Sequence, residues 1–302
     1  MHYQLLALDV DGTLIGADGA VSSQTKQAIR AACDAGMRVC LATGRSYVET
    51  MPVWRQIDWP DTPEPLVLVG GALVSEAHTG RTLYHLPMDR DLAAEFGDAL
   101  GEAGHAAMAF VDRWRHGVDY YLAECGAVHV AFERWFAKMD VTIRRVPRLA
   151  DAPDLPAPLR VSTVVDVDRA ADLADRLRQR FDGRLRVHAI LAPNYEETIV
   201  EAFSPHASKF EALRYVAQAY EIGPGRIVAV GDDVNDVEMV AGAGLGVAMP
   251  KASPPLRDAA DVTASPTLAA FIHDMLDGAY DNMADDRRKR DDGRNASRKD
   301  AP

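Results

Sequence analysis

The chain has 302 residues, a length that at roughly 150 residues per domain suggests two domains. Hydrophobic residues make up 48% and charged residues 26%, which excludes a wholly disordered, fibrous or disulfide-stapled protein. With 33 basic and 45 acidic side chains the formal net charge is −12. Nucleic acid is therefore not expected as a partner, because its phosphates are held mainly by Lys and Arg. A small anionic ligand would need the help of a cation.

Cysteine usage and the N-terminus indicate the compartment. The three cysteines form no C-x-x-C pair and lie in apolar surroundings, which favours ordinary buried thiols in a reducing compartment. The first residues carry no basic segment and reach an acid at position 9, unlike a signal peptide. No apolar run approaches the roughly 20 residues that span a bilayer. We expect a cytoplasmic protein with no membrane partner, and the sequence leaves its oligomeric state open.

Two separated parts of the chain alternate between strands and helices. The first part has three apolar runs that predict buried strands, at residues 5–8, 37–42 and 66–69. A helix after the first run begins at Ser22 or Ser23 and ends at Gly36. The second part repeats the pattern with strands at 226–230 and 245–248, and with helices at 209–220, through Val237 and Met239, and at 268–276. This alternation predicts an α/β fold with a doubly wound parallel sheet.

An insertion and a charged tail complete the organisation. Residues 83–191 mix helices with alternating strands, so we expect an inserted α+β cap domain there and a discontinuous core at 1–82 and 192–280. Residues 281–302 contain seven basic and six acidic residues and one sizeable apolar side chain, Met283. Such a segment buries too little apolar area to offset chain entropy, so we expect a disordered tail. Without it, the body carries −13.

Polar side chains follow three of the predicted strands. Asp9 and Asp11 come after the first, and Thr43 after the second. After the strand at 226–230 the chain places four polar residues within one turn: Asp232, Asp233, Asn235 and Asp236. Ligands of a doubly wound sheet bind beyond the carboxyl ends of its strands, so these groups are expected to converge. Converging carboxylates need a cation, and sparse oxygen ligation favours Mg2+ over Ca2+.

The same groups suggest phosphoryl chemistry. Asp9 and Asp11 can reach the same side once Gly12 lets the chain turn. One carboxylate then has room to attack phosphorus while the other handles the proton of the leaving group. Lys209 supplies a compact positive charge. Thr43 offers a hydroxyl, and the turn through Gly44 exposes backbone NH groups for phosphoryl oxygens.

Four segments together resemble the haloacid dehalogenase superfamily. They are DVDGTL at 9–14, LATGR at 41–45, SKFEAL around Lys209, and GDDVNDVEM at 231–239. The large insertion between the second and third is similar to that of the Cof-type, IIB-subfamily phosphatases, and the match covers about residues 3–277. The first and fourth segments, in this order and spacing, make the signal specific, whereas TGR or a lone lysine would mean little.

The resemblance implies a role for each matching residue. It implies that Asp9 is the nucleophile that forms an aspartyl-phosphate, and that Asp11 first protonates the leaving oxygen and then activates water. It implies Mg2+ held by Asp9, the backbone carbonyl of Asp11 and Asp232, with Asp236 as a further acid near the ion. The groups implied to bind the phosphoryl group are Thr43, Gly44, Lys209 and Asn235. The expected substrate is a small phosphorylated metabolite, such as a sugar phosphate.

The chain departs from the family pattern in two loops near the site. Gly70-Gly71-Ala72 stands where the family usually has Asn-Gly-Ala, and Pro250-Lys251-Ala252 where it usually has Gly-Asn-Ala. Phe210 also replaces the glycine that commonly follows the lysine. No catalytic group is lost, and Lys251 would replace an amide with a charge.

Several residues keep two interpretations. Asp233 is either a metal ligand or a helix N-terminal acid. Arg45 either reaches substrate or forms a surface salt bridge. In the insertion, a basic and aromatic cluster either contacts the leaving group or is an exposed turn: Arg113, Trp114, Arg115 and His116. Asn194, Tyr195 and Glu196 are further specificity candidates.

Three functions stay open at this point. The leading one is a Mg2+-dependent phosphatase. A phosphomutase or phosphotransferase is the first alternative, since a sugar hydroxyl can intercept an aspartyl-phosphate in place of water. A non-catalytic binding protein that kept the fold is the second, and the retention of Asp9, Asp11, Lys209 and Asp232 speaks against it.

Overall fold

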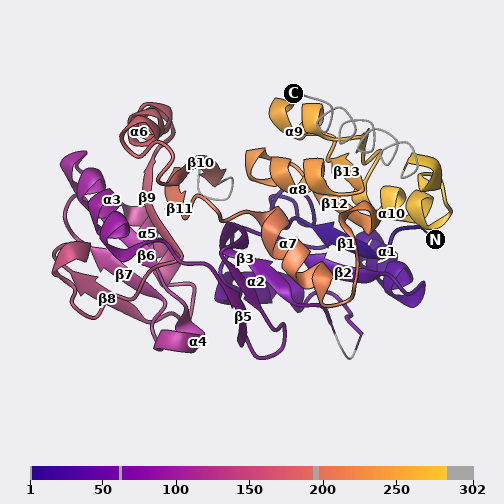
Figure 1. Cartoon of the computed structure of the whole chain (residues 1–302), viewed down its shortest axis with the longest axis horizontal. Helices are drawn as coiled ribbons and strands as arrows, with labels where there is room; N and C mark the ends of the chain where they lie inside the picture. Colours follow the sequence, from indigo (N-terminus) through magenta and orange to yellow (C-terminus); the bar gives the residue numbers. More distant parts are fainter. Residues whose placement is uncertain (1, 61–62, 193–196, 284–302) are drawn as a thin grey trace, which may run out of the picture. The chain divides into compact units, whose positions relative to one another are not determined.

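The computed structural model describes residues 2–60, 63–192 and 197–283, which form two compact units (Figure 1). We call the first the core unit; it comprises Met1–Gly44, Met51–Val67 and the described residues from Ser208 onward. The second, the insert unit, comprises Arg45–Thr50 and Leu68–Ala207. The predicted tail at 281–302 lies outside the described residues from 284 on, while residues 281–283 form a helical turn.

A five-stranded parallel sheet organises the core unit. Its strand order is β14-β13-β12-β1-β2, and the strands are β1 (Leu5–Leu8), β2 (Arg38–Leu41), β12 (Ile227–Gly231), β13 (Leu245–Ala248) and β14 (Val262–Thr263). Every residue of β1 and β12 is buried, as expected for parallel strands covered on both faces. β1 pairs with β12 on one side and β2 on the other, so the two ends of the sequence share one sheet (Figure 1). The predicted doubly wound sheet is confirmed.

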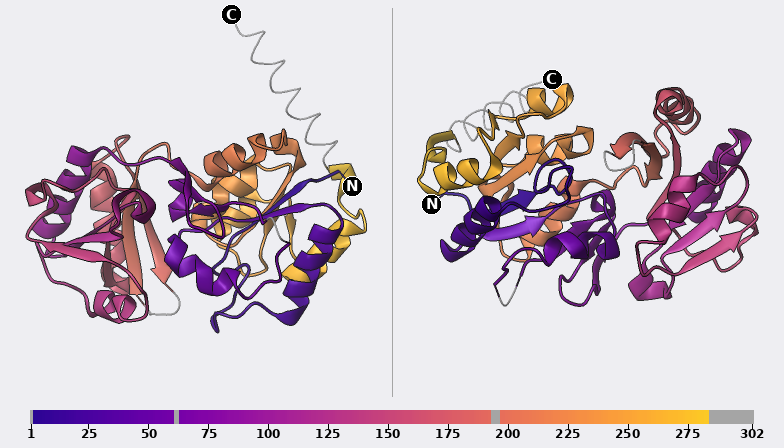
Figure 2. Two further views of the ribbon diagram at one scale, coloured as in Figure 1. Left: turned by 90° about the horizontal axis from the view of Figure 1, so that it is seen from below. Right: turned by 180° about the vertical axis from the view of Figure 1, so that it is seen from behind.

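Helices cover this sheet in two groups (Figure 2). One group is α1 (Ser23–Asp34) with α10 (Leu268–Leu276), and the other is α7 (Lys209–Gln218), α8 (Val237–Gly242) and α9 (Pro254–Ala259). The Ser22 side chain accepts a hydrogen bond from the amide of Thr25, which fixes the start of α1. Helix α2 (Tyr47–Trp54) follows β2. The Ser22 cap thus fixes where the chain that leaves β1 enters α1.

The predicted third strand belongs to a separate sheet. β3 (Leu66–Leu68) forms a three-stranded sheet with β4 (Leu73–Ser75) and β5 (Thr82–His85). An isolated parallel bridge between Ala42 and Val67 joins it to the end of β2. The prediction of a buried strand at 66–69 is confirmed for Leu66–Leu68, but this strand pairs in a sheet of its own and is not a full member of the core sheet. The reason is that β3 is short and the chain reverses directly after it.

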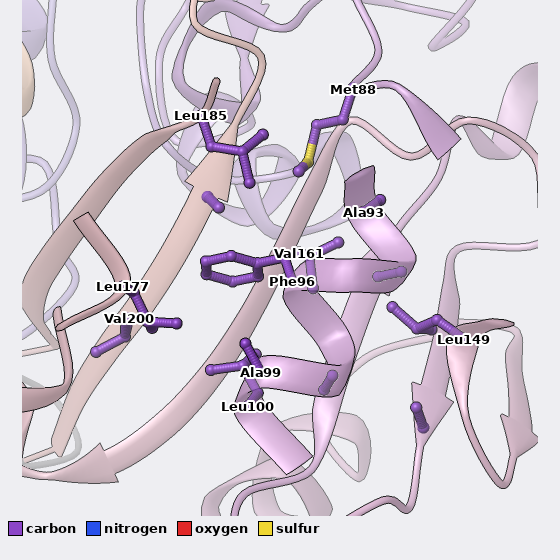
Figure 3. Close-up of a cluster of buried hydrophobic side chains, with 14 of the residues drawn as sticks. Met88, Ala93, Phe96, Ala99, Leu100, Leu149, Val161, Leu177, Leu185 and Val200 are labelled. Atoms are coloured by element: carbon purple, nitrogen blue, oxygen red, sulfur yellow. The ribbon is translucent and has the colours of Figure 1, made fainter. Parts of the chain in front are cut away.

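The insert unit has a mixed six-stranded sheet in the order β10-β11-β9-β6-β7-β8. Its strands are β6 (Ala107–Phe110), β7 (Tyr120–Ala123), β8 (Ile143–Val146), β9 (Arg160–Asp166), β10 (Arg186–Ala192) and β11 (Glu197–Phe203). Its helices are α3 (Arg90–Glu102), α4 (Arg113–His116), α5 (Val130–Phe136) and α6 (Val167–Arg180). Phe96 of α3 and Leu177 of α6 pack with Val161 and Val200 of the sheet (Figure 3). This cluster is the insert's own hydrophobic core.

The insert unit extends beyond the expected range of 83–191. Strand β11 starts at Glu197, yet it pairs along its length with β9 and β10. Residues 68–85 also group with the insert unit. The strand pairing therefore places the C-terminal boundary of the insert unit after β11, whereas the sequence pattern predicts this boundary before β11.

None of the helices in the described part of the chain combines the length and the hydrophobicity needed to span a membrane.

Candidate active site

Two neighbouring strands deliver the first acids of the site. Asp9 follows β1 and Asp232 follows β12, and these two strands pair in parallel register. The amide of Asp9 donates to the carbonyl of Val230 at 3.0 Å, so the pairing continues up to the acid itself. The carboxyl ends of adjacent parallel strands thus bring the two carboxylates to one edge of the sheet.

Lys209 joins this edge from the first position of α7. The side chain of Ser208 caps that helix by accepting a hydrogen bond from the amide of Glu211. The Lys209 ammonium donates to Asp9 Oδ1 and to Asp236 Oδ1, at 2.6 Å in each case, and the lysine is 1% exposed. Burial lowers the pKa of Lys209, but attraction to Asp236 and Asp9 outweighs it and raises that pKa above its ordinary value. Lys209 is therefore charged.

The ammonium group of Lys209 is shared by two buried carboxylates, those of Asp9 and Asp236. Burial raises the pKa of Asp9 well above its ordinary range, and repulsion from Asp236 adds to this rise while Lys209 opposes it. The trio formed by Asp9, Asp236 and Lys209 carries a formal charge of −1 when all three groups are ionised. This excess of negative charge favours a further cation at the site.

Asp236 also holds the loop that follows β12. Its Oδ2 accepts hydrogen bonds from the amides of Asp232 at 3.1 Å and Asp233 at 3.3 Å. Asp233 in turn caps the short helix Val234–Asp236, because its Oδ1 accepts from the amide of Val234 at 2.8 Å. Of the two interpretations of Asp233, these contacts support the helix N-terminal one.

Three carboxylates could hold a cation here. Asp9, Asp232 and Asp236 each offer an oxygen within 4.8 Å of the others. Burial, followed by repulsion from Asp236 and Asp233, raises the pKa of Asp232 to about 7. The charge of Asp11 adds to this rise, so Asp11 lies near the same cluster. A set made only of carboxylate oxygens fits a hard divalent ion.

Gly12 allows Asp232 to approach the first loop. Its φ is +79°, and a Cβ on it would lie 2.0 Å from Asp232 Oδ2. A similar close approach occurs at Gly231, where a Cβ would lie 2.5 Å from the Cβ of Asp236. Both glycines are therefore required by the packing of the acids.

Gly12→Ala is expected to lower catalytic efficiency about 100-fold, because the methyl group displaces the Asp232 carboxylate. Gly19→Ala is the matched control: its φ is +69°, but nothing lies within 4 Å of its Cβ position. The control should lose about 1–2 kcal/mol of stability from backbone strain and keep its turnover per folded molecule. Turnover of both variants, normalised to the folded fraction, tests this. Equal losses in the two variants would rule out the steric explanation.

The remaining predicted site residues follow β2 or β12. Thr43 is buried and its amide donates to the carbonyl of Val67 at 2.9 Å, and Gly44 follows it with open space at its Cβ position. Asn235 is half-buried in the helix Val234–Asp236. Arg45 belongs to the insert unit, where its Nη1 donates to the carbonyl of Glu49 at 3.2 Å.

The predicted leaving-group residues form α4 of the insert unit. Arg115 Nε lies 3.3 Å from Asp112 Oδ2, and Arg113 Nη1 donates to the carbonyl of Asp140 at 2.7 Å. His116 ends this helix and is exposed. These contacts lie within the insert unit and support the interpretation as an exposed, ion-paired turn. Asn194, Tyr195 and Glu196 lie outside the described residues.

Sequence reasoning missed the residues that support the site. Ser208 caps the helix that carries Lys209, and the pattern of a Ser followed three residues later by Glu211 could have revealed it. The amide of Ser253 donates to the carbonyl of Asp232 at 2.8 Å. No local sequence pattern predicts the contact between Ser253 and Asp232, because it joins two loops that are separate in the sequence.

Residues 6–269 match the family described as haloacid dehalogenase-like hydrolase. The chain belongs to this family. The predicted resemblance is thereby confirmed, and with it the assignment as a hydrolase. The family match spans both the core unit and the insert unit.

Relatives of this haloacid dehalogenase-like hydrolase carry phosphatase names. It is 24% identical over 260 residues to the putative phosphatase YxeH of Bacillus subtilis, covering 86% of this chain and 92% of that one. It is 29% identical over 254 residues to the 5-amino-6-(5-phospho-D-ribitylamino)uracil phosphatase YitU of the same organism, covering 81% and 86%. A putative HAD/COF-like hydrolase from Plasmodium vivax shares the fold with a TM-score of 0.74 at 21% identity, covering 93% and 96%.

Proposed function

We propose that the protein is a Mg2+-dependent phosphatase that hydrolyses phosphate monoesters of small metabolites through an aspartyl-phosphate on Asp9. The observation that carries this proposal is the contact of Lys209 with Asp9 and Asp236, beside Asp232. A buried carboxylate held by a buried ammonium group is positioned to meet an incoming phosphoryl group. The phosphatase names of the relatives support the same reaction class.

Asp9 is the proposed nucleophile. Asp9 is 4% exposed, and its Oδ1 accepts a hydrogen bond from Lys209. The other oxygen, Oδ2, would attack phosphorus. Lys209 would balance the negative charge that gathers as the phosphoryl group transfers, so positioning and electrostatics supply most of the catalysis.

Asp11 is the proposed general acid and base. It is half-buried on the turn that follows Asp9, whereas Asp9 is buried, so Asp11 is the more accessible of the two carboxylates to a leaving group or to water. It would protonate the leaving oxygen first and then take a proton from the water that attacks the aspartyl-phosphate.

Mg2+ fits the carboxylate cluster described above. Asp9 and Asp232 would hold it together with the backbone carbonyl of Asp11, and Asp236 would lie near it. The ion would neutralise negative charge on the phosphoryl oxygens. Three further groups are proposed to bind those oxygens from the neighbouring loops: Thr43, Gly44 and Asn235.

The proposed substrate is a small phosphorylated metabolite, such as a sugar or sugar-alcohol phosphate. The name of the B. subtilis relative YitU specifies a substrate with a phosphorylated ribityl group, which is a sugar-alcohol phosphate. The three cysteines, Cys33, Cys40 and Cys125, are free, which supports the proposed cytoplasmic location.

A panel of phosphate monoesters tests the function. Phosphate release is measured with Mg2+, with EDTA, and with Mg2+ restored after EDTA. We expect release that requires Mg2+ and returns on restoration. If no ester in a broad panel is hydrolysed under any condition, the proposed function is wrong. Conversion of a hexose 1-phosphate to its 6-phosphate without free phosphate would point to a phosphomutase instead.

The pH dependence of Mg2+ binding follows from Asp232. Because the pKa of Asp232 is raised to about 7, the metal-free protein holds a proton there below that pH, whereas the unfolded chain releases it near pH 4. The metal-free fold therefore loses stability as the pH rises through 7, and Mg2+ binds more tightly over the same range. Titration of Mg2+ into the protein at pH 6 and pH 8 should give the tighter binding at pH 8. Equal affinities would contradict the assignment of Asp232 as a ligand.

A further inference from the structure

A short turn from Met249 to Ser253 is hydrogen-bonded at both ends to the end of β12 and the loop that follows it. The amide of Met249 donates to the carbonyl of Gly231 at 2.9 Å, and the amide of Ser253 donates to the carbonyl of Asp232 at 2.8 Å. Within the turn, the amide of Ala252 donates to the carbonyl of Met249 at 3.0 Å. The backbone of this turn is therefore held beside the carboxylate cluster by direct contacts within the core unit.

Lys251 lies in the middle of this turn. Its side chain is exposed, and among the described residues no hydrogen bond or ion pair engages its ammonium group. Lys209 differs in both respects, because it is buried and shared by two carboxylates. The turn thus presents a hydrated cation that the folded chain leaves uncommitted. A lysine of this kind binds carboxylates and phosphates as a mobile point charge.

The carboxylates near this turn would repel an anionic substrate, and the Lys251 ammonium group would weaken that repulsion. The two adjacent loops carry five acids, and Lys209 pairs with two of them, Asp9 and Asp236. The other three are Asp11, Asp232 and Asp233. One divalent ion would leave the set negative, and an anionic group on the leaving portion of a substrate would be repelled by it. A free ammonium group on this turn would offset that repulsion for substrates that carry a second anion.

We propose that Lys251 is a specificity-determining residue that selects phosphate monoesters whose leaving group carries a carboxylate or a second phosphate close to the ester oxygen. This inference rests on the proposed phosphatase function and adds to it a substrate class. The Lys251 ammonium would bind the second anion while the phosphoryl group occupies the site at Asp9.

The test uses two matched pairs of esters that differ in one group. They are 2-phosphoglycolate with 2-hydroxyethyl phosphate, and 3-phosphoglycerate with glycerol 3-phosphate. The variant is Lys251→Gln, which keeps the length and polarity of an exposed side chain. The control is Arg226→Gln, which removes the same charge from an exposed residue directly before β12, at the opposite edge of the core sheet.

We expect Lys251→Gln to lower kcat/KM for both carboxylate esters about tenfold, mainly through KM, and to change their alcohol counterparts less than about twofold. Arg226→Gln should affect neither member of a pair selectively. A Lys251→Gln variant that lowers both members equally, or lowers neither, overturns the inference. So does a wild-type protein that hydrolyses the alcohol esters and disfavours the carboxylate esters. Failure of the wild type on all four esters, with hydrolysis of other esters of the broad panel, also overturns the inference. Failure on every ester of that panel overturns the proposed function itself, which separates the two outcomes.

Discussion

Asp9→Asn is expected to lower the rate of phosphate release by at least about a thousandfold, because an amide cannot form the acyl-phosphate that splits the reaction into two steps. The fold should survive, since the amide has the shape of the carboxylate and its oxygen can still accept from Lys209. Burial raises the pKa of Asp9, so an ionised Asp9 costs the metal-free protein stability at neutral pH. The thermal midpoint of the metal-free variant should therefore equal or exceed that of the wild type.

The control for this result is Asp34→Asn. Asp34 is an exposed carboxylate at the end of α1 that pairs with Arg30 at 2.9 Å. Its replacement should leave the rate of phosphate release unchanged and alter stability by less than about 1 kcal/mol. If Asp9→Asn retained wild-type turnover with the same ester, Asp9 could not be the nucleophile.

Lys209→Met is expected to destabilise the metal-free protein by about 3–5 kcal/mol, because it leaves Asp9 and Asp236 buried without their shared counter-ion. The loss should be largest at pH 8. It should shrink at pH 5, where protonation of the carboxylates removes part of the uncompensated charge. Activity should fall with stability, since Lys209 also balances charge on the phosphoryl group. Urea unfolding at the two pH values measures the effect.

A double-mutant cycle separates charge from packing at this position. The variant with both Asp9→Asn and Lys209→Met should be more stable than Lys209→Met alone, because one of the two uncompensated charges has gone. Lys26→Met serves as the control for loss of a lysine, because Lys26 lies on α1 and the lysine paired with Asp9 and Asp236 is Lys209. Additive effects of Asp9→Asn and Lys209→Met would mean that the two groups do not interact, in conflict with their 2.6 Å contact.

Much of the core is predictable because its signals are local. The apolar runs of β1 and β13 end where the sequence indicates, and α10 has the predicted bounds. In the insert unit, the sequence pattern does not predict β11, because two buried acids, Glu197 and Glu201, interrupt its apolar residues. One of them, Glu201, is paired with Arg160 of β9 at 3.1 Å, and both are buried. Partners that are 41 positions apart cannot be recognised from local patterning.

The candidate active site is likewise predictable from the sequence only in part. Motif order and spacing are enough to predict that Asp9, Lys209 and Asp232 meet at one edge of the sheet. They cannot predict that Asp236 accepts two backbone amides as well as the Lys209 ammonium, because that arrangement depends on how the loop after β12 turns. The anchoring of the turn that carries Lys251 is hidden from sequence patterning for the same reason.

The most direct test of the central claim is the mass of peptides from enzyme quenched rapidly with acid during turnover of a good substrate. We expect the peptide containing Asp9 to gain the mass of one phosphoryl group, and this gain should disappear in Asp9→Asn. The phosphorylated peptide should accumulate when Asp11→Asn slows the attack of water. Turnover with the phosphoryl group on another residue, or on none under the same quench conditions, would contradict the central claim.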